Sequence, residues 1–173
     1  MAIDPTPRVE IRVLDVRLRD WGPPDYQTPL SAAIDLHACI DAPLRLAAGE
    51  PPALISSGIA VHMDNAHMAA LVLPRSGLGH KKGLVLGNLT GLIDADYMAP
   101  IYVSLWNRNP PGSEPILVEP GERIAQLLFV PVLRPAFAFV DSFSGSSARG
   151  EGGFGSTGTA PALPHAAGAR ASG

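Results

Sequence analysis

The chain has 173 residues and a mass of 18.1 kDa, which suits one domain with a short tail and excludes two full domains. Hydrophobic residues make up 46% and charged residues 17%, a balance that excludes a wholly disordered chain. The formal net charge of −3 excludes a general positive field, so an anionic ligand has to be held by a local group of cations.

The single cysteine, Cys39, excludes an internal disulfide and a zinc site built from several thiols. The N-terminal residues lack the apolar stretch of a signal peptide. The longest apolar run, 127–133, contains Pro131 and is far too short to cross a membrane. We therefore expect a soluble cytoplasmic protein with no membrane or nucleic-acid partner.

Apolar runs bounded by Pro, Gly, Asp and Asn predict strands, in chain order, at residues 9–13, 34–38, 53–61, 68–73, 101–105, 116–118, 124–132 and 136–140. Strict alternation at 9–13 and 101–105 predicts half-buried strands with one apolar face turned inward. Few windows keep helical spacing without proline, so we expect at most one short helix. Many short strands with frequent turns predict an all-β sandwich, jelly roll or barrel.

Asp35 lies between Ile34 and Leu36 in the second predicted strand. If its carboxylate is buried, it needs a partner, which the backbone, a cation or a bound metal could supply. A purely structural role and a functional role both remain open for it.

Residues 73–79 (LPRSGLG) place the guanidinium of Arg75, the hydroxyl of Ser76 and glycine amides close together after a strand. These groups suit a phosphate ligand. The alternative is an ordinary turn at the end of a strand, with an exposed arginine.

The segment 88–97 (NLTGLIDADY) follows the apolar run 84–87, a pattern that predicts a hairpin with a tight turn and exposed backbone donors and acceptors. Asp94 and Asp96 share a face if the chain is extended, and either is suited to act as a general base or to approach a metal. The alternative is a pair of solvated turn carboxylates.

The glycine-rich segment 149–158 (RGEGGFGSTG) contains a formal G-x-G-x-x-G. No strand–helix unit surrounds it, and Ser156 stands where a Walker A loop needs lysine, so both dinucleotide and P-loop interpretations fail. A mobile anion clamp and a flexible linker remain. The five histidines show no zinc-ligand spacing.

Together, five segments resemble, in content and order, the five motifs of the trimeric deoxyuridine triphosphatase (dUTPase) family. They are 31–36 (SAAIDL), 74–79 (PRSGLG), 88–97, 120–127 (PGERIAQL) and 149–158. The similarity runs from about residue 9 to 158, and the stretch 73–88 resembles the bacterial branch. Ala33 and Ala99 stand where the family usually has glycine, so a turn there has to adjust if it needs a positive φ.

The resemblance implies an all-β, dUTPase-like jelly-roll sandwich over residues 1–148 and a closing motif over 149–158. The remaining residues, 159–173, are mostly Ala, Gly, Pro and Ser and predict a disordered tail. It implies hydrolysis of dUTP to dUMP and pyrophosphate by in-line attack of water on the α-phosphorus, which limits uracil in DNA and supplies dUMP for thymidylate synthesis. It also implies a homotrimer with shared active sites, in which a neighbouring subunit lends the fifth motif. A dCTP deaminase on the same fold and a nucleotide-binding protein without turnover remain alternatives.

The resemblance further implies that Asp94 deprotonates the attacking water and that Asp35 reaches a Mg²⁺ ion through water. The implied substrate-binding residues are Arg75, Ser76, Gly77, Asn88, Leu92, Ile93, Tyr97, Tyr102, Gln126, Arg149, Phe154, Gly155, Ser156 and Thr157. The backbone around Asn88 would read uracil, Tyr97 would exclude a ribose hydroxyl, and Phe154 would cover the base.

Overall fold

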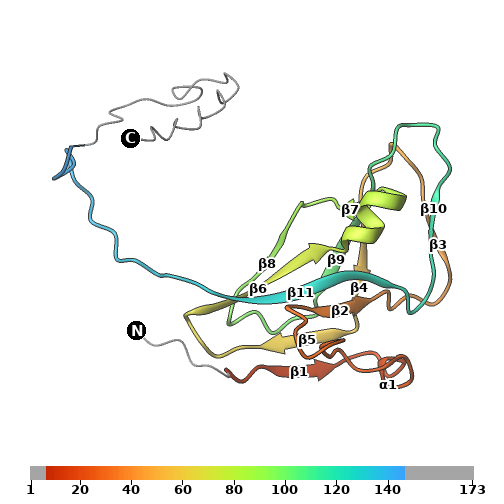
Figure 1. The fold of residues 1–173 in the computed structure, drawn as a ribbon, viewed down its shortest axis with the longest axis horizontal. Helices are drawn as coiled ribbons and strands as arrows, with labels where there is room; N and C mark the ends of the chain where they lie inside the picture. The colour runs from red at the N-terminus through yellow and green to blue at the C-terminus, as the bar shows by residue number, and fades with distance from the viewer. Residues whose placement is uncertain (1–6, 147–173) are drawn as a thin grey trace, which may run out of the picture. The chain divides into compact units, whose positions relative to one another are not determined.

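The computed structural model describes residues 7–146 (Figure 1). The chain divides into two units, Met1–Pro135 and Ala136–Gly173. The strands, all in the first unit, are β1 (Glu10–Val13), β2 (Ile34–His37), β3 (Leu44–Leu46), β4 (Ala53–Ser56), β5 (Ile59–His62), β6 (Met68–Pro74), β7 (Leu84–Leu86), β8 (Gly91–Ile93), β9 (Tyr102–Asn107), β10 (Ile116–Val118) and β11 (Arg123–Pro131). The all-β prediction is confirmed, whereas the tail predicted over 159–173 lies outside the described residues.

Two short helical segments accompany the strands, α1 (Leu18–Trp21) and the π-type turn η1 (Leu78–Lys82). The expectation of at most one short helix is therefore wrong by one segment. Each is too short to show the repeated apolar spacing by which a helix is recognised in a sequence. No helix in residues 7–146 has the length and apolar character needed to span a membrane.

The strands pair antiparallel in four sheets, ordered β2-β11-β6-β8, β4-β9-β7, β1-β5 and β3-β10. Figure 1 shows β11 running between β2 and β6. The two larger sheets supply much of the core, with Leu36 and Leu127 from one and Val103 and Leu105 from the other, all nearly inaccessible to solvent. The core thus forms from the inward faces of these two sheets.

Alternation in the sequence is a reliable guide for β9 but not for β1. In β9 the side chains of Val103 and Leu105 are buried while those of Tyr102 and Trp106 are exposed, as predicted. In β1 all four residues are exposed, and Ile11 and Val13 keep 38% and 40% of their surface. The prediction of an inward apolar face is wrong for these two residues within a single chain, because the described chain leaves more than a third of each uncovered, although Val9 packs partly against the core.

The strand predicted over 53–61 is in fact two strands in different sheets, separated at Ser57 and Gly58. Gly58 has a φ of +73°, and a Cβ placed there would lie 2.5 Å from the Cys39 sulfur. Only glycine fits such a position without strain, so it is here that the chain leaves one sheet for the other.

Two further strand predictions are wrong. The strands on either side of the turn at Asn88 do not pair as a hairpin, because β7 pairs with β9 and β8 pairs with β6. Residues 136–140, predicted as a strand, contain no strand. In both cases the partner strand, which a single segment of sequence does not specify, decides the outcome.

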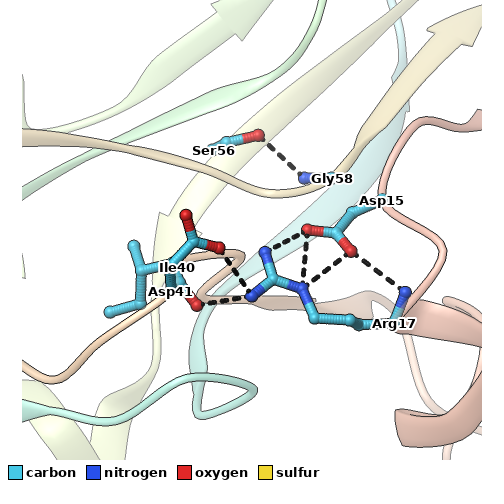
Figure 2. Close-up of polar contacts among 6 residues, drawn as sticks. All are labelled: Asp15, Arg17, Ile40, Asp41, Ser56 and Gly58. Carbon is cyan, nitrogen blue, oxygen red and sulfur yellow. Dashed lines mark hydrogen bonds and ion pairs between the residues drawn. The ribbon is translucent and has the colours of Figure 1, made fainter.

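Asp15 and Arg17 form polar contacts that connect the segment before α1 to the loop after β2 (Figure 2). Arg17 Nη2 donates to Asp15 Oδ2 at 2.6 Å, while Nη1 donates to the Ile40 carbonyl at 2.8 Å and contacts Asp41 at 3.0 Å. The same view shows the Gly58 amide donating to Ser56 Oγ at the β4–β5 turn. The hydrogen bonds from Arg17 lower the pKa of Asp15.

Candidate functional site

One face of the sheet β2-β11-β6 gathers the polar residues of three separate sequence segments. Asp35 of β2 lies directly opposite Gln126 of β11, which lies directly opposite Leu73 of β6. Opposite residues of an antiparallel pair share a face, and so do residues two apart on one strand. The same face therefore also carries Ala33, Arg75 and Leu128.

This face forms the floor of a cavity of about 590 Å³. It is lined by Gln27, Ser31, Ala32, Ala33, Asp35, Leu73, Arg75, Ser76, Gly77, Leu78, Lys81, Lys82, Gln126 and Leu128. Three of the lining residues are cations and one is a carboxylate, so the cavity has a local charge of +2 in a chain whose formal net charge is −3. Such a site attracts an anion.

The carboxylate of Asp35 is 9% exposed and is held by two arginines. Its Oδ1 lies 3.1 Å from Arg75 Nε and its Oδ2 lies 3.1 Å from Arg123 Nη1. The partner that a buried aspartate requires is thus a cation, one of the options left open by the sequence. Arg75 Nη1 also donates to the Arg123 carbonyl at 3.2 Å, so Asp35 fixes the position of Arg75 at the cavity wall.

A β-bulge brings Arg123 to this face. Arg123 pairs with His37 and Ala125 pairs with Leu36, so one extra residue lies between the two pairs. Without the bulge, Arg123 would point to the same side as Ala125, which is fully buried in the core. The bulge therefore places its guanidinium against Asp35.

His37 is 8% exposed and its Nδ1 has no hydrogen-bond partner within residues 7–146. Burial lowers its pKa, and the nearby Arg123 and Arg75 lower it further, although Asp35 acts in the opposite direction. His37 is therefore neutral at pH 7 and leaves the Asp35 charge to the two arginines.

Gln126 and the loop after β6 complete this wall of the cavity. Gln126 Nε2 donates to the Pro74 carbonyl at 3.1 Å, which orients its amide beside Arg75. Ser76 and Gly77 are exposed at the cavity. The structure thus brings together five of the predicted site residues: Asp35, Arg75, Ser76, Gly77 and Gln126.

Asp94, the predicted catalytic base, lines a different hollow. That hollow measures about 800 Å³ and contains His62, Asp64, Asn65, Ala66, Met68, Ala69, Leu92, Asp94, Ala95, Asp96, Val132 and Arg134. Ile93 at the end of β8 pairs with Ala70, so Asp94 lies at one end of β6 and Arg75 lies beyond the other end. Five to six residues of strand separate them by about 17–20 Å. No single phosphorus atom can contact both residues of one chain.

Most of the residues predicted to hold uracil and deoxyribose are exposed; Leu92 lines the Asp94 hollow, whereas Asn88 lies at the other end of β8. Asn88 is exposed in the turn after β7, and Leu92 keeps 63% of its surface, whereas Ile93 packs partly against the core. Tyr97 is 41% exposed and its hydroxyl donates to the Pro100 carbonyl at 3.1 Å. Tyr102, at the start of β9, is 51% exposed.

Five predicted site residues lie outside the described part of the chain: Arg149, Phe154, Gly155, Ser156 and Thr157. The two alanine departures are described. Neither Ala33 nor Ala99 has a positive φ, so alanine causes no backbone strain at either position.

The sequence analysis missed five polar residues at the cavity or its edge: Gln27, Ser31, Lys81, Lys82 and Arg123. Arg123 and Ser31 lie inside two of the segments that carry the family resemblance, and that position is the signal for them. Lys81 and Lys82 are the only lysines in the chain and follow the Arg75 loop, and this position could have indicated that they lie at the same site. Nothing in the sequence marks Gln27.

Comparison with known proteins gives a consistent result. A family model described as dUTPase matches residues 19–158. Deoxyuridine 5'-triphosphate nucleotidohydrolases of Sodalis glossinidius and Methylibium petroleiphilum are 53% and 55% identical to this chain, over 87% of it and 97% of each relative. A structure of the Staphylococcus bacteriophage 80alpha dUTPase with dUpNHpp is similar, with a TM-score of 0.74 and 28% identity over 88% of this chain and 99% of that chain.

Proposed function

This chain belongs to the dUTPase family, and we propose that it hydrolyses dUTP to dUMP and pyrophosphate in sites shared between copies of the chain. The observation that carries the proposal is the cation-lined cavity, into which three of the family-like segments converge. The reaction limits uracil incorporation into DNA and supplies dUMP for thymidylate synthesis. We place it in the cytoplasm, where Cys39 stays reduced.

The cavity residues bind the triphosphate. Arg75 is pre-positioned by Asp35, so its free guanidinium edge makes directional hydrogen bonds to phosphate oxygens at little entropic cost. The Ser76 hydroxyl, the Gly77 amide and the Gln126 amide group add neutral donors. Phosphoryl transfer requires little beyond positioning of the reactants and stabilisation of charge, so these residues supply a large part of the catalysis.

Asp94 of a second copy supplies the base. The separation of about 17–20 Å within one chain rules out joint action of Asp94 and Arg75 from the same copy on one phosphorus. The two regions also have complementary charge, since the second hollow contains three carboxylates and the first cavity three cations. We therefore assign the Asp94 region of one copy to the phosphate cavity of another, where Asp94 deprotonates the attacking water.

The cavity fits a Mg²⁺ ion bound mainly by the substrate. Both Asp35 oxygens are occupied by arginines, and residues 7–146 contain no group of three His, Cys, Asp or Glu side chains placed to hold a metal. Asp35 is thus suited to contact the ion's waters, while phosphate oxygens are the direct ligands. When bound, Mg²⁺ would neutralise phosphate charge.

The base is selected by the turn around Asn88 and by Tyr97. The residues of that turn are exposed, and the amides of Leu89 and Thr90 already donate within it, so the Asn88 side chain and the other backbone groups of the turn pair with uracil. A close fit there rejects the thymine methyl. Tyr97 packs on the deoxyribose and leaves no room for a 2′-hydroxyl, with Tyr102 beside the substrate. The closing motif 149–158 then covers the site with Phe154 and adds Arg149, Gly155, Ser156 and Thr157 at the phosphates, leaving 159–173 as a tail.

Exposed apolar side chains support assembly into a homotrimer. In β1 and the residues after it, Ile11, Val13, Leu14 and Val16 keep 38–70% of their surface. Near the end of the described chain, Leu133, Phe137, Phe139, Val140 and Phe143 keep 60–98%. Exposed apolar side chains in such numbers are costly in water, and another chain often covers them.

Pyrophosphate release from dUTP with Mg²⁺ tests the proposal, with dTTP, dCTP and UTP at equal concentration as controls. Rapid release from dUTP alone is expected. Ammonia release from dCTP would indicate a deaminase instead, and binding of dUTP without product would indicate a nucleotide-binding protein. Either result would overturn the proposed function.

A further inference from the structure

The phosphate cavity contains one cation that the proposed function does not yet use. Lys81 and Lys82 both line the cavity. Lys82 Nζ lies 3.3 Å from Glu122 Oε1, so its charge is already offset. Lys81 is exposed and has no ion-pair partner within residues 7–146. Its ammonium group is therefore available to a ligand in the cavity.

The backbone that carries Lys81 is held in place from outside the cavity. Arg108 Nη2 donates to the Gly79 carbonyl at 2.9 Å, and Asn109 Nδ2 donates to the Lys82 carbonyl at 2.9 Å. The segment after β9 thus fastens η1 on both sides of Lys81. Short π-type turns occur frequently at functional sites, and this one presents a mobile side chain from a fixed backbone.

The chemistry of lysine suits one part of the substrate in particular. Arg75 is fixed by Asp35 and makes directional contacts, which suit the phosphates that have to be aligned for reaction. Lysine is a compact charge on a flexible stem, which suits the terminal phosphate, where charge is highest and alignment matters least. We infer that Lys81 binds the terminal phosphate of dUTP and, after hydrolysis, the pyrophosphate product. This assignment rests on the proposed function and extends it.

Binding measurements on the full chain test the assignment, using the non-hydrolysable dUpNHpp, inorganic pyrophosphate and dUMP as probes. Lys81→Ala is expected to weaken binding of dUpNHpp and of pyrophosphate by about 5- to 30-fold, the range for a solvent-exposed charge-assisted contact. Its affinity for dUMP should stay within about twofold of the wild-type value. Lys81→Arg restores most of the loss. Arg45→Gln, which removes one positive charge from β3 outside the cavity, serves as the matched control and changes none of the three affinities.

Unchanged affinity for dUpNHpp in Lys81→Ala would overturn the assignment. A loss of affinity for dUMP equal to the loss for dUpNHpp would also overturn it, because Lys81 would then contact the phosphate that dUMP retains. These readings require no turnover. A wild-type chain that binds dUpNHpp but releases no pyrophosphate from dUTP would therefore overturn the proposed hydrolysis and leave the Lys81 test intact.

Chemical labelling provides a second measurement that keeps Lys81 itself unchanged. In Lys82→Arg, Lys81 is the one lysine of the chain, so acetylation of its peptide reports on that amine alone. Pyrophosphate and dUpNHpp are expected to slow its acetylation several-fold, whereas dUMP is not. Equal labelling with and without pyrophosphate would contradict the assignment.

Discussion

At the scale of single residues, Asp35 shows how a buried charge can organise a site without reacting. It pairs with Arg75 and Arg123 at 3.1 Å each, and these contacts set the guanidinium of Arg75 at the cavity wall. Removing one partner of such a buried group leaves the others uncompensated. In the proposed function, Asp35 would therefore act partly through the arginine that it positions at the cavity.

Asp94→Asn is expected to lower turnover of dUTP by about 10²- to 10⁴-fold, the range for loss of a general base. Affinity for dUpNHpp should stay near that of the wild type, because the amide keeps the size of the side chain. Steady-state kinetics and calorimetry with dUpNHpp measure the two quantities. Asp96→Asn, a change to the other carboxylate of the turn, is the control and should retain most of the turnover. Near-normal turnover in Asp94→Asn would remove Asp94 from its role.

Gly58→Ala tests the turn that separates β4 from β5. The new Cβ would lie 2.5 Å from Cys39 Sγ and 2.9 Å from Asp15 Cβ, at a φ of +73°. Backbone strain and overpacking together should lower the free energy of unfolding by about 2–5 kcal/mol, measured by urea denaturation. Gly112→Ala, with a φ of +88° and no atom within 4 Å of its Cβ, should cost only about 1–2 kcal/mol. Equal losses would show that the space at Gly58 is unimportant.

At the scale of elements, strand pairing brings residues from distant sequence segments together at one site. The register Asp35–Gln126–Leu73 places three distant segments on one face, and the bulge in β11 turns Arg123 onto that face. A shift of one residue would send every one of these side chains to the opposite side of the sheet.

The contact between the Asp15–Arg17 segment and the β2 loop makes stability depend on pH. The pKa of Asp15 is lowered from its ordinary 3.8. Asp15 therefore contributes its full share to the free energy of unfolding above that pH, and this contribution is lost as the pH falls through the pKa of the folded state. Asp15→Asn should reduce the free energy of unfolding at pH 7 by about 1–2 kcal/mol. Its deficit should shrink below pH 4.

Urea denaturation at pH 7 and pH 3 measures this dependence. Asp41→Asn is the matched control, because Asp41 contacts the same Arg17 but its side chain is 97% exposed. It should change stability little at either pH. A deficit of Asp15→Asn that is the same at both pH values would contradict the account.

Local sequence was informative where an element depends on its own residues. The alternation in β9 and the apolar run of β6 both follow from side chains within the strand. The break at Gly58, the separation of β7 from β8 and the bulge beside Arg123 depend on a partner strand far away in the sequence. For the same reason, the sequence pointed to segments that line the cationic cavity, whereas the distance of Asp94 from that cavity was not predicted.

At the scale of the whole molecule, the proposed function divides the reaction site between two separate regions of the described chain. The cationic cavity and the Asp94 hollow lie at opposite ends of β6. In the proposed function, a neighbouring copy would cover the exposed apolar side chains of Ile11 and Val13 in β1.

Deletion of residues 149–173 should leave a folded oligomer with the mass of three chains of 18.1 kDa less the deleted segment, as measured by light scattering. Its turnover of dUTP should fall by at least about 10²-fold, because the closing motif supplies charge and covers the base. Deletion of 160–173 alone serves as the control and should change turnover little. An active 149–173 deletion would refute the role of the closing motif.

The most direct test of the shared site mixes two inactive chains. Arg75→Gln and Asp94→Asn are co-expressed with different affinity tags, and oligomers containing both are purified. In each mixed trimer one site of the three combines an intact phosphate wall with an intact Asp94, so about one third of the wild-type turnover of dUTP should return. Turnover no higher than that of the two variants alone would contradict a site built from two copies.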